Sequence, residues 1–149
     1  MTWRLTADYP QLWALGFAIL AVLAGLSIPH GPDWLLWPGV LLICAGVAIM
    51  LIASLTMRSH RTTLDPFGQP ANLVTGGVFA LSRNPIYLGD LLVVGGLCFT
   101  FGAPLAAALL VPLLMIVIRH RFIGPEEDRL ARTFPDEFAQ YGKRTRRWI

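Results

Sequence analysis

Charged residues are scarce in this chain of 149 residues, in which Asp, Glu, Lys and Arg make up 14% and hydrophobic residues 55%. Soluble domains carry roughly 25% charged residues. The charges are also unevenly placed, because none falls within residues 91–118 and thirteen fall within residues 119–149. A soluble domain of this length would have too little polar surface to cover it. The composition therefore excludes a soluble enzyme and a disordered chain, and it favours a small integral membrane protein.

Cysteine and histidine are also few. Cys44 and Cys98 each stand alone in an apolar run, and His30, His60 and His120 are scattered without HxxxH spacing. We expect buried structural thiols and no metal site, and a secreted disulfide scaffold is excluded. No GxGxxG motif follows a strand and no P-loop occurs. These absences exclude a Rossmann or Walker nucleotide site.

The charge balance is basic, with a net charge of +3 and a pI near 9.3. Such a balance is compatible with nucleic-acid binding, but most of the basic residues flank apolar segments. Anionic lipid headgroups are the better partner. We therefore expect contact with a membrane and none with nucleic acid.

Two uncharged windows, residues 9–32 and 34–57, each predict a transmembrane helix. A third window, residues 91–118, is long for one crossing and short for two, since each needs roughly 20 residues. Gly102-Ala103-Pro104 interrupts it. Starting one helix at Pro85 and ending a second at Phe122 gives two short helices, residues 85–101 and 104–122.

The positive-inside rule favours two crossings in this third window. Arg58, Arg61 and Arg83 place the loop after the second helix in the cytoplasm, and eight of the twelve basic residues follow Ile118. Only a hairpin returns those eight to the same side. We therefore predict an all-α integral membrane protein with four transmembrane helices, the third and fourth forming a tight hairpin. Short cytoplasmic C-terminal helices follow, and both termini lie on the cytoplasmic side of an inner or plasma membrane.

The residues capable of chemistry collect in residues 58–90 and 119–149. Arg83-Asn84-Pro85 is typical of a helix start, with Asn84 as N-cap and Pro85 at the first position. The same three residues also suit a carboxylate site, because a helix N-terminus lies beside an arginine. Asp90 lies deeper, where an ionisable group is either functional or serves the helix dipole.

The run Gly124-Pro125-Glu126-Glu127-Asp128 has the same two interpretations, an ordinary helix start or a functional carboxylate. A cationic and an anionic helix start on one membrane face favour a zwitterionic ligand between them. The segment KRTRRWI predicts a basic surface strip anchored by Trp148, without a catalytic residue.

Two stretches of this polar part resemble a known family. LVTGGVFALSRNPIYLGDLL and, after the apolar run, PEEDRLARTFPDEFAQYGKRTRRW resemble the isoprenylcysteine carboxyl methyltransferases, which are related to the membrane phospholipid methyltransferases. The resemblance covers about residues 58–149. It implies one membrane domain over residues 1–149, with two N-terminal transmembrane helices in 1–57 and a methyltransferase-like catalytic core in 58–149.

The resemblance further implies an enzyme that uses S-adenosylmethionine and releases S-adenosylhomocysteine. The positions that match the family's cofactor-binding residues are Asn72, Leu73, Val74, Phe79, Asn84, Pro85, Tyr87 and Glu126. Arg83 matches the arginine that would hold a carboxylate of substrate or cofactor, and Arg121 would face a lipid-side substrate. Arg83 and Glu126 are therefore the expected catalytic residues.

Two positions depart from the family pattern. Asn84 replaces the usual histidine, so it can still form hydrogen bonds but cannot act as a base near neutral pH. Phe79 replaces the usual tyrosine and keeps only the ring. These departures leave cofactor use in place and put the family's name-giving substrate in doubt.

We expect methyl transfer to a small lipophilic acceptor, either an isoprenylcysteine-like carboxylate or a lipid amine or thiol. In this hypothesis Glu126 orients the cofactor and Arg83 fixes an anionic group, while the acceptor enters from the bilayer. Two alternatives stay open: an NADPH-dependent membrane reductase of similar architecture, and a non-catalytic membrane partner.

Overall fold

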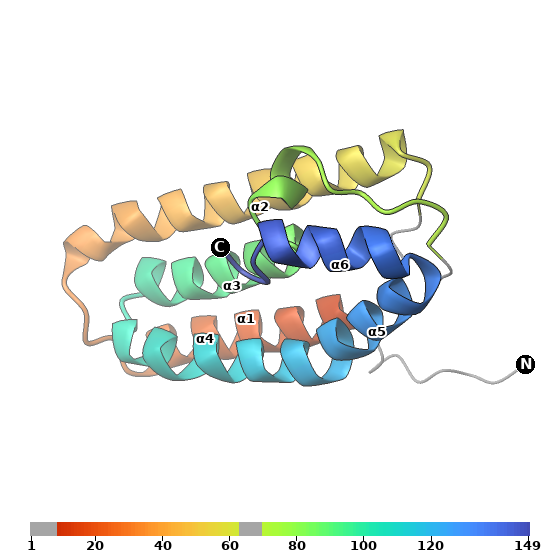
Figure 1. The fold of residues 1–149 in the computed structure, drawn as a ribbon. Coiled ribbons are helices and arrows are strands. Elements are labelled where there is room, and N and C mark those ends of the chain that lie inside the picture. Colours follow the sequence, from red (N-terminus) through yellow and green to blue (C-terminus); the bar gives the residue numbers. More distant parts are fainter. Residues whose placement is uncertain (1–8, 63–69) are drawn as a thin grey trace, which may run out of the picture.

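The computed structural model describes residues 9–62 and 70–149, and the regular structure in these ranges is entirely helical (Figure 1). The prediction of an all-α chain is confirmed for this part. The elements, in chain order, are α1 (Pro10–Ser27), the 3₁₀ turn η2 (Asp33–Leu35), α2 (Leu36–Ser59), the 3₁₀ turn η3 (Gly77–Ala80), α3 (Pro85–Thr100), α4 (Pro104–Ile118), the π-helical segment η4 (Arg119–Ile123), α5 (Gly124–Thr133) and α6 (Pro135–Arg144).

Three helical segments are long and apolar enough to cross a membrane: Pro10–Ser27, Asp33–Ser59 and Pro104–Thr133. The first two match the first two predicted windows. Helix α3 is also apolar but has only 16 residues. The structure therefore supports a helical membrane protein, and the count of four spans stays a prediction.

Helices α2 and α3 approach each other through glycine. A Cβ built on Gly96 would lie 2.7 Å from the Gly39 carbonyl oxygen, and one built on Gly89 would lie 2.7 Å from that of Gly46. The paired positions are seven residues apart in each helix, which brings them to the same helix face. Because Gly39 meets Gly96 and Gly46 meets Gly89, the two helices run antiparallel at backbone contact.

Helix α1 buries one stripe of mostly small side chains, at Pro10, Ala14, Phe17, Ala21 and Gly25. The spacing of three and four residues places them on one helical face. Phe17 joins α3 and α4 residues in the main apolar core, while the other α1 faces are exposed leucine and isoleucine. An apolar surface of this extent fits lipid better than water.

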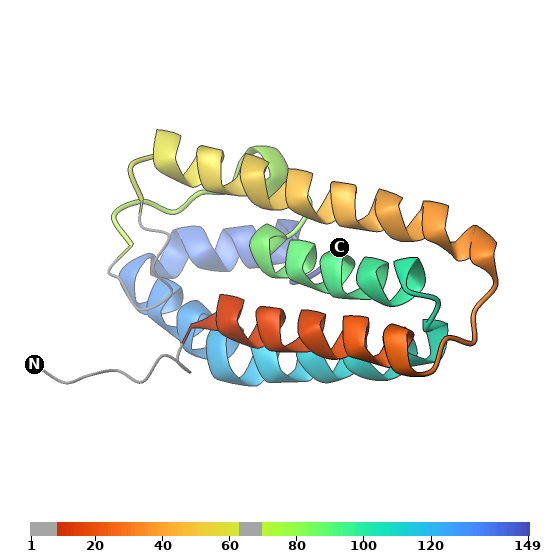
Figure 2. The same cartoon turned by 180° about the vertical axis from the view of Figure 1, so that it is seen from behind.

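The loop after α1 meets the turn between α3 and α4. The N–H groups of His30 and Gly31 both donate to the Gly102 carbonyl oxygen, at 2.9 and 2.8 Å. Gly102 has a φ of +70°, a left-handed conformation that favours glycine at this turn. One end of the bundle is thus closed by two connections, while α5 and α6 lie at the other (Figures 1 and 2).

The long helix after this turn does not end at Phe122, so that predicted boundary is wrong. The chain passes through the π-helical segment η4 directly into α5, with the Gly124 N–H donating to the Arg119 carbonyl oxygen. Pro125 follows and has no N–H to return to the preceding turn. A wider turn placed just before this proline lets the helix continue to Thr133, which carries the acidic residues of α5 onto the bundle.

Candidate functional site

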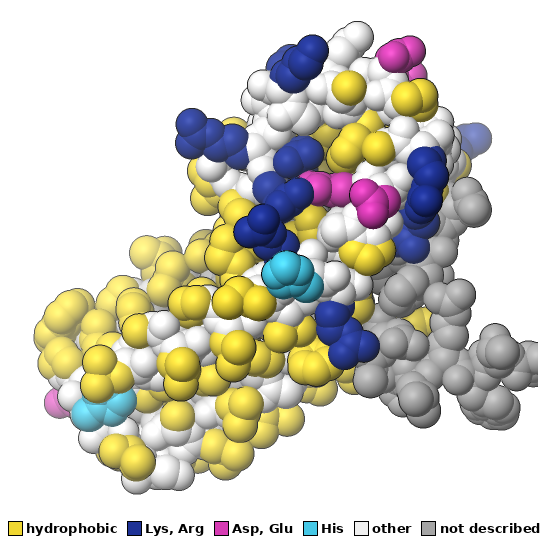
Figure 3. All heavy atoms as spheres, turned by 60° about the horizontal axis from the view of Figure 1, so that its bottom comes forward, with side chains coloured by type: hydrophobic (Ala, Val, Ile, Leu, Met, Phe, Trp, Pro, Cys, Tyr) yellow, Lys and Arg dark blue, Asp and Glu magenta, His cyan; other side chains and the backbone are white. Residues whose placement is uncertain are grey.

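Charged side chains gather at one end of the molecule, whereas the rest of the face in Figure 3 is largely hydrophobic. The elements at this end are η3, the start of α3, α5, α6 and the C-terminal segment, residues 145–149 (Figure 1). The two sequence stretches that resemble the methyltransferase motifs therefore lie together. Their contacts define the candidate site.

The C-terminal segment lies across the start of α3. The Asn84 side-chain Nδ2 donates to the Arg147 carbonyl oxygen at 3.0 Å, and the Ser82 hydroxyl donates to the same oxygen at 3.3 Å. The Arg83 N–H donates to the Arg146 carbonyl oxygen at 3.0 Å, and the Thr145 hydroxyl to that of Ala80 at 3.3 Å. A segment more than 60 residues away in sequence thus fixes the backbone before α3.

The helix start predicted at Pro85 is confirmed, but the capping role predicted for Asn84 is wrong. Asn84 occupies the N-cap position, and its side chain makes no capping hydrogen bond. Instead, the amide contacts the C-terminal segment, and the Asn84 N–H donates to the Ser82 hydroxyl at 3.1 Å. The side chain therefore acts as a tertiary contact, which a local motif does not reveal.

Arg83 pairs with Glu127, the neighbour of the predicted Glu126. The distance from Arg83 Nη1 to Glu127 Oε1 is 3.5 Å, and the two side chains are 17% and 15% exposed. Arg147 binds the same carboxylate through two nitrogens. Its Nε donates to Oε1 at 3.1 Å, and its Nη2 donates to Oε2. The hydrogen bond to Glu127 raises the pKa of Arg147 above its ordinary value. Two cations thus share one anion, which leaves a net positive charge.

The Arg83 side chain has a buried N–H group that donates to no partner among the described residues. Its Nε is buried and has no hydrogen-bond partner, while its guanidinium lies 5.9 Å from the centre of the Phe138 ring. A buried N–H without a partner is costly. An anionic ligand oxygen would satisfy it.

Tyr87 and Glu126 connect the two motifs directly. The Tyr87 hydroxyl on α3 donates to Glu126 Oε2 on α5 at 3.0 Å. Arg129, one turn further along α5, is close enough to interact electrostatically with Glu126. Two residues predicted at the cofactor site from separate motifs are therefore in contact.

Leu73, Val74 and Phe79 form an apolar wall, and Phe138, the ring near Arg83, packs against it. Val74 and Phe79 are buried in a cluster with Ala53 and Tyr141, and Leu73 packs against the edge of that cluster. The Tyr141 hydroxyl donates to the Phe79 carbonyl oxygen at 2.5 Å. Burial raises the pKa of Tyr141 above its ordinary value, which keeps the hydroxyl protonated. The 3₁₀ turn η3 is thereby attached to α6.

Two of the predicted residues make different contacts. The Asn72 side-chain Nδ2 donates to the His60 carbonyl oxygen at 2.8 Å, at an exposed position near the end of α2. The Arg121 guanidinium on η4 lies 5.2 Å from the centre of the Trp13 ring on α1. Neither of these two contacts involves Tyr87 or Glu126.

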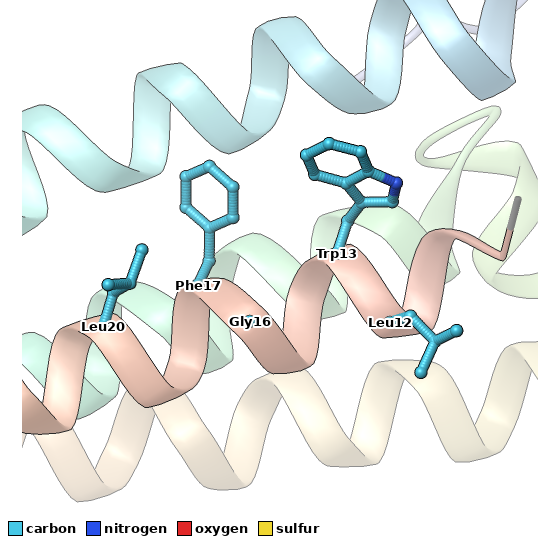
Figure 4. Close-up of a pocket in the computed structure, with 5 residues that line it drawn as sticks. All are labelled: Leu12, Trp13, Gly16, Phe17 and Leu20. Atoms are coloured by element: carbon cyan, nitrogen blue, oxygen red, sulfur yellow. The ribbon is translucent and has the colours of Figure 1, made fainter. Parts of the chain in front are cut away.

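Trp13 also lines an apolar groove of about 370 Å³ on α1, together with Leu12, Gly16, Phe17 and Leu20 (Figure 4). The space at Gly16 is open, because a Cβ built there would meet no atom within 4 Å. Figure 4 shows the Trp13 and Phe17 rings pointing toward the neighbouring helix. The groove places apolar surface beside Arg121, at the predicted lipid side.

Sequence reasoning missed Glu127, Arg147 and Tyr141. Glu127 was visible as the second acid of the EE pair, but nothing local distinguishes the two acids. Arg147 lies in the segment predicted to be a surface strip without a site role. Arg147 contacts Glu127 and Asn84, so the prediction that this segment is only a surface strip is wrong. Among the described residues, no group of His, Cys, Asp and Glu side chains is arranged to hold a metal ion.

The fold and this polar end define a small helical membrane protein whose candidate site lies at one end of the bundle. A family model described as phospholipid methyltransferase matches residues 34–137, more than two thirds of the chain. The chain therefore belongs to the phospholipid methyltransferase family, and the resemblance stated from its motifs is confirmed. Searches of curated proteins and of solved structures gave no significant match.

Proposed function

We propose that this protein transfers a methyl group from S-adenosylmethionine to a small lipophilic acceptor at the polar end of the bundle. Family membership supports methyl transfer in general. The observation that carries the proposal for this site is the hydrogen bond between Tyr87 and Glu126, which joins the two motifs. The lipid-like surface of the helices supports an acceptor that arrives from the membrane.

The residues at the site fit the charges of this cofactor. Its methionine part carries a carboxylate and an ammonium group, and Arg83 offers the buried Nε donor that has no partner. Glu126 offers a carboxylate for a donor group of the cofactor. Asn84, Pro85, Tyr87 and the Leu73–Val74–Phe79 wall would complete the binding surface, with Asn72 at its edge. When bound, the cofactor supplies a methyl group on a positively charged sulfur.

The protein's own contribution is to hold the reacting groups in place and to exclude water from them. Arg83, oriented by Glu127, binds an anionic group of the ligand. Glu126, oriented by Tyr87, binds a hydrogen-bond donor group of the cofactor. The apolar wall keeps water from the reacting atoms, and alignment of nucleophile and methyl group supplies most of the acceleration. Arg121, beside the groove on α1, would contact the lipid-side acceptor. Carboxylate, amine and thiol acceptors all satisfy this description.

We further propose that α3 is a fourth span and forms a hairpin with α4. The turn between them accepts hydrogen bonds from the loop after α1, so α3 reaches the same end of the bundle as α1. Sixteen residues give about 24 Å at 1.5 Å per residue, which suits a thin hydrocarbon region. The basic residues at the opposite end favour the cytoplasmic side of an inner or plasma membrane for both termini.

Calorimetry in detergent tests the cofactor site. We expect S-adenosylhomocysteine to bind the purified protein, and Glu126→Ala to weaken that binding by at least tenfold. Glu137→Ala, which removes an exposed acid from the first turn of α6, is the matched control and keeps the affinity. Unchanged affinity of Glu126→Ala contradicts the assigned role. Binding of NADPH in place of S-adenosylhomocysteine would favour a reductase, and binding of neither would favour a non-catalytic protein.

A further inference from the structure

The C-terminal segment, residues 145–149, lies beyond the residues that the family model matches, and the function proposed above gives it no role. It is nevertheless held on two sides. The carbonyl oxygens of residues 146 and 147 accept hydrogen bonds from residues 82–84, and Trp148 packs against the main apolar core. The segment is therefore built into the bundle beside the candidate site.

Arg147 contacts the site through two different groups. Its side chain binds the Glu127 carboxylate through Nε and Nη2, and its carbonyl oxygen accepts from Asn84 Nδ2 at 3.0 Å. A guanidinium that binds a carboxylate through two nitrogens fixes the orientation of that carboxylate as well as its position. Glu127 lies in the first turn of α5 and Asn84 directly precedes α3, so this one residue connects the two helix starts that carry the motifs.

Glu127 passes this orientation on to Arg83. Its Oε1 accepts from Arg147 Nε at 3.1 Å and lies 3.5 Å from Arg83 Nη1. The contact with Arg83 is longer than the roughly 2.7–2.9 Å of a charge-assisted hydrogen bond, so it does not hold the carboxylate in one orientation by itself. Arg147, with two hydrogen bonds, is the tighter partner and decides where the carboxylate points.

Helix α6 also confines the Arg83 guanidinium. Its centre lies 5.9 Å from the centre of the Phe138 ring, and a Cβ built on Gly142 would lie 3.4 Å from Nη1. The Arg83 side chain is only 17% exposed. It therefore has little room to turn, and the direction of its guanidinium depends on where the Glu127 carboxylate is held.

We propose that Arg147 is a positioning residue of the cofactor site, which fixes Glu127 and thereby orients Arg83 toward the carboxylate of the cofactor's methionine part. This inference rests on the proposed function, in which Arg83 binds that carboxylate. The charges support it as well. Arg83 and Glu127 alone would form a neutral pair, whereas two cations and one anion leave a net charge of +1. The second arginine thus lets Arg83 attract an anion while it stays oriented.

Arg147→Gln tests the assignment, because it removes the charge and the contact through two nitrogens. The full chain is studied in detergent, and calorimetry compares S-adenosylhomocysteine with its decarboxylated analogue, which keeps the ammonium group. We expect Arg147→Gln to bind S-adenosylhomocysteine roughly tenfold more weakly, the effect of losing one hydrogen bond to a charged group, and to bind the analogue as wild type does. A defect in positioning Arg83 affects only the ligand with a carboxylate, whereas general damage to the site weakens both.

Three further variants sharpen the test. Arg147→Lys keeps the charge but not the planar fork, so we expect it to recover part of the affinity for S-adenosylhomocysteine. Arg83→Gln should cause the same selective loss, and Arg147→Gln should add little to it in the double variant, because both act on one contact. Arg144→Gln, at an exposed arginine in the last turn of α6, is the matched control and keeps the affinity for both ligands.

The outcomes are distinguishable. An equal loss for both ligands in Arg147→Gln, or no loss for either, overturns the assignment while the proposed function stands. Additive effects of Arg83→Gln and Arg147→Gln also overturn it, because Arg147 would then act without Arg83. Wild type that does not bind S-adenosylhomocysteine overturns the proposed function itself. If Arg147→Gln does not fold, Arg147→Lys carries the comparison of the two ligands, and a loss confined to S-adenosylhomocysteine supports the assignment.

Discussion

The apolar part of the bundle and its polar end are held together by different forces. Helices α2 and α3 meet where glycine removes the side chain altogether, at Gly39–Gly96 and Gly46–Gly89. At the polar end, by contrast, Arg83, Glu127 and Arg147 form ion pairs between elements far apart in sequence. Within a bilayer the hydrophobic effect does not drive helices together, so close packing must do so. At the water interface, charged and hydrogen-bonding groups can position a site.

The difference predicts that the two parts fail in different ways. Substitutions that enlarge a side chain between packed helices should destabilise the bundle at any salt concentration. Substitutions that remove a charge should destabilise the polar end and weaken ligand binding first. Three substitutions test this contrast, one in the helix contact and two at the polar end.

Gly96→Leu should have the largest effect. A Cβ at this position would lie 2.7 Å from the Gly39 carbonyl oxygen, which is backbone and cannot move aside without separating α2 from α3. We expect a loss of about 3 kcal/mol or failure to fold, independent of salt. Thermal unfolding followed by circular dichroism in detergent measures it. Gly16→Leu, whose Cβ has no atom within 4 Å, is the matched control and should leave the melting temperature unchanged.

Local sequence signals predicted much of the fold because they depend on neighbouring residues. Proline at the first helical position located the start of α3 at Pro85, and the uncharged windows located α1 and α2. The end of the long helix was predicted wrongly at Phe122, because the π-helical segment η4 carries it past Pro125. Hydrophobicity alone gives no signal for such a turn.

The site was less predictable, since its contacts join distant residues. Glu126 and Glu127 look equivalent in sequence, but consecutive residues point about 100° apart around a helix. One therefore meets Tyr87 and the other meets Arg83 and Arg147. Which acid meets which partner depends on how α5 is rotated against α3, and no local pattern encodes that angle.

Glu127→Gln should have the second largest effect. It leaves Arg83 and Arg147 close together without their shared anion. Hydrogen bonds to charged groups contribute roughly 1.5–3 kcal/mol, so we expect a loss of about 2 kcal/mol that becomes smaller in high salt. Affinity for S-adenosylhomocysteine should also fall, because Arg83 loses its orientation. Unfolding and calorimetry at two salt concentrations measure both effects. Glu137→Gln on the exposed face of α6 is the control, and equal behaviour of the two variants contradicts the bridging role.

Tyr141→Phe should have the smallest of the three effects and adds a pH dependence. The substitution removes the hydroxyl that donates to the buried Phe79 residue's carbonyl oxygen, at a cost of about 1.5 kcal/mol. Burial raises the pKa of Tyr141 in the folded protein above the value of about 10 expected when unfolded. The folded state therefore favours the protonated hydroxyl, so the contribution of this hydroxyl to stability is complete below about pH 10 and decreases as the pH rises further.

Wild type should lose stability above pH 10 more steeply than Tyr141→Phe, as unfolding midpoints at pH 8, 10 and 11 would show. Parallel curves for the two proteins would mean that the η3–α6 contact does not depend on this proton. If the unfolding midpoint of wild type falls above pH 10 while its helix content stays constant, the loss of stability lies at the polar end. The glycine-packed bundle is then intact.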